Sequence, residues 1–215
     1  MYWNPPKFLQ GAAVAVLGGG PSLTVEQVNR VRHAGYRVIG VNDAYQFGTS
    51  VDLCFFGDGA WYLGDKEGKF RGHAQRLSRW HGLVVTCSPD CVQLPQIHGL
   101  LQRNDPGLWP TPCCRWYRNS GFSAIGLAVT LGAVKIVLLG FDGREVNGLT
   151  HWHMGCLEKP DNRVFMEHHK SAQELMDDIT RYPGGRGVRV LNCTPDSGYA
   201  AFEQAGLDEV LGDRT

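Results

Sequence analysis

The segment from Val14 to Thr24 constrains the fold more than any other part of the chain. An apolar run, Val14–Leu17, stops at three consecutive glycines, and a helical pattern begins at Thr24. A buried strand, a tight turn and a helix N-terminus in this order can direct backbone N–H groups and the helix dipole at an anion. Glycines let the backbone approach a ligand closely, and we expect this turn to need positive φ. The candidate phosphate-binding residues are Gly18, Gly19, Gly20, Pro21 and Ser22.

The glycine loop differs from the two common phosphate motifs. A Walker loop ends in Gly-Lys-Ser/Thr, and no such tripeptide follows Gly20. A dinucleotide fingerprint needs a third glycine, and Leu23 stands at that position. Asp43 lies at the spacing of the acidic residue that binds ribose in such folds, so the dinucleotide interpretation is weakened and stays open. A turn that only reverses the chain is the alternative.

Length and charge set the broad class. The 215 residues suit one α/β domain, and we expect an N-terminal arm at 1–10 and a single nucleotide-binding domain at 11–215. The 21 basic residues equal the 21 acidic ones, which argues against general nucleic-acid binding. No apolar segment approaches the length of a membrane span, and the N-terminus lacks the pattern of a signal peptide. We therefore expect a cytoplasmic protein.

The cysteines and tryptophans leave alternatives open. Seven cysteines in a chain without an export signal indicate reduced thiols, and no pair has the CxxC spacing of a zinc site. We therefore predict no metal site among them. Trp3, Trp109 and Trp116 fit either a homo-oligomer interface or core packing.

Short apolar runs alternate with helical patterns along the chain. The runs that predict strands are Ala12–Leu17, Arg37–Val41, Leu53–Phe56, Leu83–Thr86, Lys135–Leu139 and Val188–Leu191. The helical patterns include Thr24–Ala34, which opens with a capping-box sequence, Gly121–Leu131 and Phe165–Thr180. Continuous apolar runs suit parallel strands that are covered on both faces. The alternation therefore predicts an α/β fold with a single Rossmann-like, doubly wound, mostly parallel sheet.

Residues that directly follow strands are the next site candidates. Ligands of doubly wound sheets bind beyond the carboxyl ends of the strands, where the strand order reverses. Asn42 and Asp43 follow the second predicted strand, Asp58 follows the third, and Asp142 follows the fifth. Each residue alone fits an ordinary turn, but together they predict a polar site at one edge of the sheet.

A second anion site is predicted where the helix of small residues begins. Asn119, Ser120 and Gly121 open this helix, so a hydroxyl and free N–H groups meet there. Arg115 and Arg118 lie just upstream and can clamp a phosphate as bidentate donors. The alternative is a solvated basic turn.

Two histidines flank Trp152. In an extended segment His151 and His153 point the same way, so they can ligate a metal, or one can act as a general base with Asp142 nearby. A half-exposed loop with backbone-bonded histidines is the alternative.

Two further histidines lie on the last long helix. There Phe165, His169, Ala172 and Met176 form one stripe. We expect His168 and His169 to be one packed and one solvated histidine.

The spaced motifs resemble a known group of transferases. The motifs are Gly19–Leu23, Val41–Asp43, Asn119–Gly121 with Ala124–Gly132, and Ile136–Asp142. In this order they resemble the bacterial oligosaccharide sialyltransferases, the motility-accessory glycosyltransferases and hydroxymethylpterin diphosphokinase-like proteins. Uncharacterised phage proteins are similar, including the His-Trp-His stretch and the Asn-Cys-Thr-Pro ending. A phage origin would place the protein in the host cytoplasm.

The resemblance implies a Rossmann-like fold with a nucleotide ligand, which is a cytidine monophosphate donor in the sialyltransferases. The resemblance implies that Gly20 and Ser22 contact the phosphate and that Asn42 contacts the nucleotide sugar or donor. It also implies that Ser120 and Gly121 contact the phosphate or ribose, and that Asp142 contacts the ribose or base. It also implies a histidine base after the Gly-x-Asp motif, for which His151 and His153 are the candidates. The family's tyrosine pair that supports the leaving phosphate has no counterpart after Asp142.

Three functions remain open. The leading hypothesis is glycosyl transfer from a nucleotide-activated donor to an acceptor hydroxyl. A histidine would act as the base, and Arg115 or Arg118 would contact the leaving phosphate. This reaction requires no cofactor. The second is diphosphoryl transfer from ATP, with Mg²⁺ held by Asp43, Asp58 and Asp142. The third is a non-catalytic protein that binds or sequesters a nucleotide or assists assembly.

Overall fold

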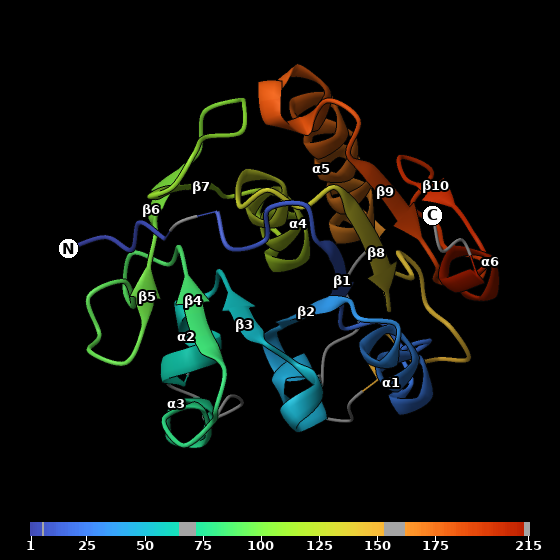
Figure 1. Cartoon of the computed structure of the whole chain (residues 1–215). Coiled ribbons are helices and arrows are strands. Elements are labelled where there is room, and N and C mark those ends of the chain that lie inside the picture. Colours follow the sequence, from blue (N-terminus) through green and yellow to red (C-terminus); the bar gives the residue numbers. More distant parts are fainter. Residues whose placement is uncertain (6, 65–71, 153–161, 213–215) are drawn as a thin grey trace.

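Eight parallel strands form the main sheet of the computed structural model, which describes residues 1–5, 7–64, 72–152 and 162–212 (Figure 1). The strands are β1 (Ala13–Leu17), β2 (Arg37–Val41), β3 (Leu53–Phe56), β4 (Leu83–Thr86), β5 (His98–Gly99), β8 (Lys135–Leu139), β9 (Arg189–Asn192) and β10 (Glu203–Gln204). A second parallel pair joins β6 (Leu101–Arg103) and β7 (Cys113–Arg115). The predicted α/β fold with a mostly parallel sheet is confirmed.

The order of the strands reverses between β1 and β8. Across the sheet the order is β10-β9-β8-β1-β2-β3-β4-β5. The chain thus builds outward from β1 to β5, returns to the other side of β1 with β8, and then builds outward to β10. In doubly wound sheets a ligand crevice opens beyond the carboxyl ends of the strands at such a reversal. The fold therefore puts the ends of β1 and β8 at the expected site.

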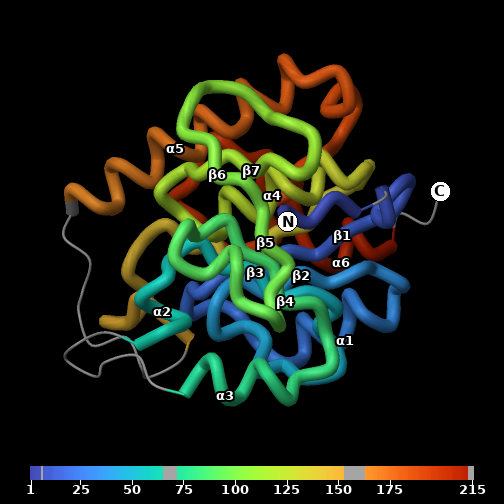
Figure 2. Tube along the Cα trace, turned by 90° about the vertical axis from the view of Figure 1, so that its left-hand side faces the viewer, coloured from blue at the N-terminus to red at the C-terminus, as the bar shows by residue number. Residues whose placement is uncertain are grey.

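Helices cover both faces of the sheet (Figures 1 and 2). One face carries α4 (Ser120–Thr130) and α5 (Asn162–Arg181); the other carries α1 (Val25–His33), α2 (Gly59–Leu63), α3 (His73–Leu77) and α6 (Leu207–Gly212). Two 3-10 helices, η1 (Asn42–Ser50) and η2 (Pro183–Gly185), complete the elements. On β1, Val14 and Val16 pack toward α4, whereas Ala15 and Leu17 pack toward α1. This two-sided burial is why the strands are continuous apolar runs.

The long predicted elements lie where the sequence places them. β2, β3, β4 and β8 have the predicted bounds, and β1 and β9 differ by one residue. The capping box of α1 is also confirmed, because Thr24 Oγ1 accepts from the Gln27 amide at 3.2 Å and Gln27 Oε1 accepts from the Thr24 amide at 2.9 Å. The missed strands β5, β6, β7 and β10 have two or three residues each, too few to show a period.

Helix α4 is buried along its whole length. All 11 of its residues are buried, and it contacts β1, β2, β3 and α5. Small residues permit this close approach; at Gly126 a Cβ would lie 2.9 Å from the Leu108 side chain. Gly132, at φ +101°, follows the C-cap Leu131 and ends the helix. The apolar character of α4 reflects this interior position, and among the described residues no helix is long and apolar enough to cross a membrane.

Several residues near the N-terminus contact the rest of the protein. The Trp3 amide donates to Gly99 O at 2.7 Å, and the Trp3 ring lies 5.0 Å from that of His98. Leu9 is buried in the main core, and Asn4 Oδ1 accepts a bond from Thr111 Oγ1. These contacts place Trp3 at the β5 edge of the sheet and Leu9 in the main core.

Candidate nucleotide-binding and active site

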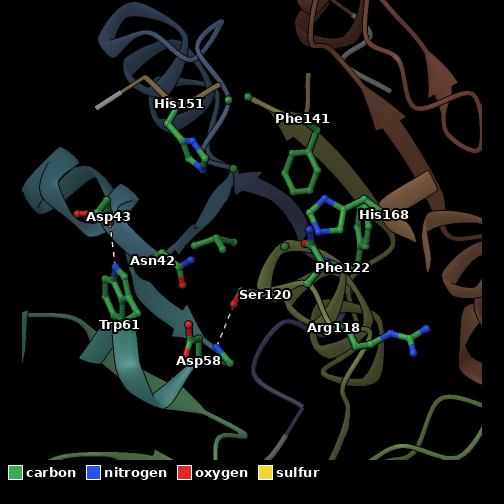
Figure 3. Close-up of a pocket in the computed structure, with 18 of the residues that line it drawn as sticks. Asn42, Asp43, Asp58, Trp61, Arg118, Ser120, Phe122, Phe141, His151 and His168 are labelled. Atoms are coloured by element: carbon green, nitrogen blue, oxygen red, sulfur yellow. Dashed lines mark hydrogen bonds between the residues drawn. The ribbon is translucent and has the colours of Figure 1, made fainter. Parts of the chain in front are cut away.

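A cavity of about 750 Å³ opens beyond the carboxyl ends of β1, β2, β3, β4 and β8. Twelve of the predicted site residues line it: Gly18, Gly19, Gly20, Asn42, Asp43, Asp58, Arg118, Asn119, Ser120, Gly121, Asp142 and His151. Figure 3 shows several of them around the space. Pro21, Ser22 and Arg115 are not part of its lining, and His153 lies outside the described residues. Topology thus brings together segments that are distant in the sequence.

The amides of the glycine loop are largely used within the protein. The Gly18 amide donates to Leu139 O and the Gly20 amide to Gly140 O, both at 2.8 Å. The predicted phosphate contacts of these two amides need correction, because β8 already accepts their hydrogens. Among the described residues no acceptor faces the Gly19 amide, which remains able to bind an anion.

The loop requires glycine for a different reason from the one the sequence suggested. None of the three glycines has positive φ, so that expectation is wrong. A Cβ on Gly18 would lie 2.5 Å from Gly140 O, and one on Gly20 would overlap the Asp142 carboxylate. A Cβ on Gly19 would lie 3.1 Å from the ring of His151. The glycines therefore let the end of β8 and the His151 loop pack directly on the turn.

The start of α4 is the more open anion site. Ser120 Oγ accepts from the Gly57 amide at 3.1 Å, and Asn119 Oδ1 accepts from the Phe122 amide at 3.2 Å. Within the described part of the chain no acceptor faces the amides of Ser120 and Gly121, and both residues line the cavity. At α1, by contrast, the capping box already occupies the N-terminus. The positive end of the α4 dipole is thus the one that faces the cavity.

The predicted phosphate clamp has to be corrected at Arg115. Its guanidinium is buried against the carboxylates of Asp178, at 2.5 Å, and Glu174, at 3.1 Å. Tyr117 donates a further bond of 2.8 Å to Asp178. Arg115 therefore fastens β7 to α5, and its charge is neutralised inside the protein. Arg118 lies at the cavity rim, where its backbone has φ +56° and its side chain is exposed.

Asp142 braces the glycine loop from the end of β8. Its side chain is buried, and Oδ2 accepts a 2.9 Å bond from the Ser22 hydroxyl. This bond explains why Ser22 lies outside the lining. Asp142 Oδ1 has no hydrogen-bond partner among the described residues. Burial raises the pKa of Asp142, because a low-dielectric surrounding disfavours the carboxylate.

Asn42 and Asp43 differ in their availability to a ligand. Asn42 has φ +50°, and its buried Oδ1 lacks a partner in the described structure. Figure 3 shows the Asn42 side chain on the cavity wall between Asp43 and Asp58. Asp43 accepts bonds from Trp61 Nε1 at 2.9 Å and from Gln46 Nε2 at 2.8 Å. Asp43 thus fixes the Trp61 wall, whereas Asn42 still requires a hydrogen-bond donor.

The three carboxylates predicted to hold Mg²⁺ each accept a hydrogen bond within the protein. Asp58 Oδ1 accepts the Ala60 amide at 2.9 Å and so caps α2. Asp43 and Asp142 are bonded to Trp61 and Ser22, as described above. Among the described residues no three His, Cys, Asp or Glu side chains lie close enough together to hold a metal ion. The magnesium hypothesis stays a prediction, and the six described cysteines are free thiols.

Two described histidines reach the cavity from different elements. His151 lies over Gly19, with its Nδ1 at 3.0 Å from Thr150 Oγ1. His168 comes from α5, and its ring lies 6.3 Å from that of Phe122 (Figure 3). Burial lowers the pKa of His168, so this imidazole is neutral near pH 7. A neutral imidazole inside a cavity can accept a proton.

Sequence reasoning missed an aromatic wall and underrated His168. The aromatic residues that complete the lining are Trp61, Trp116, Phe122, Phe141, Trp152, Phe165 and Tyr199. On α5 the buried stripe runs through Ala172, Leu175 and Ile179, so His168 continues it at helical spacing. The stripe predicted from the sequence ran through Met176, one residue away from Leu175. A stripe drawn through Leu175 selects His168 as the inward-facing histidine.

The fold matches two sialyltransferase structures. One is the monofunctional alpha-2,3-sialyltransferase Cst-I from Campylobacter jejuni, 15% identical, with a TM-score of 0.53 over 90% of this chain and 79% of that chain. The other is an alpha-2,3-sialyltransferase from Campylobacter jejuni in apo form, 15% identical, with a TM-score of 0.51 over 92% and 81%. No family model and no curated protein matches the chain by sequence. The structural comparison shows that the chain has the fold of these sialyltransferases.

Proposed function

We propose that this protein transfers a glycosyl group from a nucleotide-activated donor to an acceptor hydroxyl. One observation carries the proposal: the open N-terminus of α4 and the Gly19 amide meet in one cavity that also contains the neutral His168. This arrangement supplies donors for a phosphate and a proton acceptor for a hydroxyl in the same space. The cavity volume of about 750 Å³ is ample for a nucleotide sugar.

The nucleotide is assigned to the polar part of the cavity. Its phosphate would bind the amides of Gly19, Ser120 and Gly121, and Arg118 at the rim would add a positive charge. The unpartnered oxygens of Asn42 and Asp142 would accept hydrogen bonds from ribose hydroxyls or a base amine. The motif resemblance to the oligosaccharide sialyltransferases implies a cytidine monophosphate donor, and we therefore take CMP as the first nucleotide to test.

His168 is our first choice for the general base. The base has to be neutral and has to lie beside the acceptor rather than the phosphate. His151 lies over Gly19, where an imidazole is better placed to donate to a phosphate. The His168 ring comes from α5 and lies 6.3 Å from the ring of Phe122. We therefore assign His151 to the donor side and His168 to the acceptor side, a change from the sequence-based choice of His151 or His153.

The first experiment identifies the nucleotide. A thermal-shift screen of the whole chain with CMP, CDP, UDP, ATP and GTP, each with and without Mg²⁺, is expected to show stabilisation by CMP without a metal requirement. Incubation with a CMP-activated sugar is then expected to release CMP. Binding without CMP release would favour the non-catalytic hypothesis, and AMP formation from ATP only with Mg²⁺ would favour diphosphoryl transfer. Stabilisation by none of these nucleotides would overturn the proposal.

The second experiment separates the two histidines. We expect His168→Ala to lower kcat by about 10²- to 10⁴-fold with little change in CMP affinity, because it removes the base. His151→Ala is expected to weaken CMP binding instead. Lys170→Ala, an exposed change on the same helix, is the matched control. If His168→Ala retains full turnover, His168 is not the base.

A further inference from the structure

Arg144 is a second permanent cation on the cavity wall, and the sequence analysis did not select it. Among the described residues that line the cavity, the permanent cations are Arg118 and Arg144. They belong to different elements, since Arg118 precedes α4 and Arg144 follows β8. With Arg115 neutralised by Asp178 and Glu174, these two arginines carry the fixed positive charge of the site.

Arg144 follows a segment that contacts the glycine loop. The end of β8 contacts this loop through the bond from the Gly20 amide to Gly140 O, and through the bond from Ser22 to Asp142. Arg144 lies two residues beyond Asp142. Its positive charge partly offsets the effect of burial on the pKa of Asp142, so its field reaches this carboxylate. A phosphate at the Gly19 amide would therefore experience the same field.

The Arg144 side chain is anchored but not neutralised. Its Nε donates a 2.6 Å hydrogen bond to the backbone carbonyl of Asp196. The Asp196 carboxylate lies 3.9 Å from Nη2 and is 90% exposed, so water screens that ion pair strongly. Arg115, in contrast, is itself buried and pairs with the buried Asp178 carboxylate and with that of Glu174. The N–H groups on the two Nη atoms of Arg144, and its positive charge, therefore remain available to bind another anion.

The turn at residues 192–198 holds the Arg144 loop in place. This turn contains the Asn-Cys-Thr-Pro-Asp-Ser segment, which the sequence singled out and the proposed function did not use. Its bonds to the loop are Asn192 Nδ2 to Phe141 O at 3.3 Å, Ser197 Oγ to Phe141 O at 2.6 Å, the Phe141 amide to Thr194 Oγ1 at 2.9 Å, and the Gly198 amide to Asp142 O at 2.7 Å. A cation held this firmly loses little freedom when it binds a ligand.

We infer that Arg144 is a catalytic residue that binds the leaving phosphate, with the 192–198 turn as its support. The inference rests on the proposed function. In the transfer, the bond between the anomeric carbon and the phosphate oxygen breaks, and its electron pair stays on that oxygen. The acceptor oxygen bonds to the anomeric carbon, and its proton passes to the histidine. The Arg144 guanidinium stabilises the negative charge that develops on the phosphate.

Titration calorimetry with CMP and with cytidine tests this contact, because only CMP carries the phosphate. Arg144→Ala is expected to weaken CMP binding by about tenfold to a hundredfold and to leave cytidine binding unchanged. Arg144→Lys is expected to bind CMP with an affinity between those of the wild type and Arg144→Ala. The lysine keeps the positive charge but lacks the paired N–H donors of a guanidinium group. Arg186→Ala, an exposed arginine outside the lining, is the matched control and is expected to bind like the wild type.

Turnover provides a readout that a structural role would not move. With a CMP-activated sugar, Arg144→Ala is expected to lose kcat, and added guanidinium at low concentration is expected to restore part of it. If Arg144→Ala does not fold, Arg144→Lys and Arg144→Gln carry the same comparison. Wild-type affinity for CMP in all Arg144 variants would overturn this inference and leave the proposed function standing. A wild-type protein that binds neither CMP nor cytidine would remove both.

Discussion

The Gly57 amide donates a 3.1 Å hydrogen bond to the Ser120 hydroxyl, and this bond ties the end of β3 to the first residue of α4. Both residues line the cavity, so the bond fixes the distance between two of its walls. It also holds the open amides of Ser120 and Gly121 toward the ligand. The bond thus links the stability of the fold to the geometry of the anion site.

Replacing the Ser120 hydroxyl is expected to affect both properties. In Ser120→Ala the Gly57 amide loses its acceptor, which costs about 1–3 kcal/mol where the amide stays dry. Urea unfolding measures this loss, and calorimetry with CMP is expected to show weaker binding. Ser120→Thr keeps the hydroxyl and is the control. Equal stability of Ser120→Ala and wild type would show that water replaces the hydroxyl.

The glycine loop is expected to respond differently at neighbouring positions. Gly20→Ala would force Cβ onto the Asp142 carboxylate and to 2.6 Å from Gly140 O, so we expect a loss of about 1–3 kcal/mol in unfolding free energy. Gly19→Ala would meet only the His151 ring, so weaker CMP binding is expected to exceed any loss of stability. At Gly212 an added Cβ meets nothing within 4 Å, which makes Gly212→Ala the control. A Gly20→Ala protein as stable as this control would contradict the packing described for β8.

Arg115 is expected to act on stability and not directly on phosphate. Arg115→Ala leaves the buried Asp178 carboxylate without its cation, and such losses cost about 3–5 kcal/mol. The double variant Arg115→Met with Asp178→Leu removes both charges and is expected to recover most of this stability. Denaturant unfolding of both proteins gives the comparison. Unchanged stability of Arg115→Ala combined with a hundredfold loss of CMP affinity would restore the sequence-based phosphate clamp.

The lowered pKa of His168 predicts how kcat/KM falls at acidic pH. A base acts only when neutral, so kcat/KM is expected to fall as pH drops through the His168 pKa, which lies below the ordinary value of 6.5. His151→Ala is expected to show the same fall of kcat/KM at acidic pH, whereas any residual activity of His168→Ala is expected to lack it. A pH profile of kcat/KM for the three proteins decides between the histidines.

Asp142 is expected to make stability depend on pH in the opposite direction from a paired carboxylate. Its folded pKa is raised above the ordinary 3.8, so the unfolded chain releases this proton at a lower pH than the folded protein does. As pH rises from 3.8 through the folded pKa, this group therefore removes stability, and above that pKa the loss is constant. Asp142→Asn is expected to lack this decline. Urea unfolding from pH 3.5 to 7 measures the difference between the two proteins.

Local sequence was sufficient for the long elements. Ala13–Leu17 and Lys135–Leu139 form buried parallel strands because their continuous apolar runs suit no half-exposed position. The capping box at Thr24 formed as predicted because its partners are three residues apart. The candidate site followed from a topological rule, which placed Asn42 and Asp142 at one edge of the sheet, and both line the cavity there.

Tertiary structure decided which groups remain available to a ligand. The sequence shows that Gly18, Gly20 and Arg115 stand beside the expected site, but it does not show that β8 carbonyls take the two amides and that Asp178 takes the guanidinium. These partners lie far away in the sequence. Arg144 had no local signal, because its position depends on the turn at 192–198. His168 had one in the helical spacing of α5, which the choice of Met176 over Leu175 concealed.

The sequence by itself therefore determined the sheet, its helices and the edge at which a ligand can bind, because hydrophobic periodicity and turn chemistry act over a few residues. Only the tertiary structure determined which amides, cations and neutral histidines at that edge remain available to a ligand. The physical reason is that a hydrogen-bond donor or a charge is open to a ligand only when no distant part of the chain has already satisfied it.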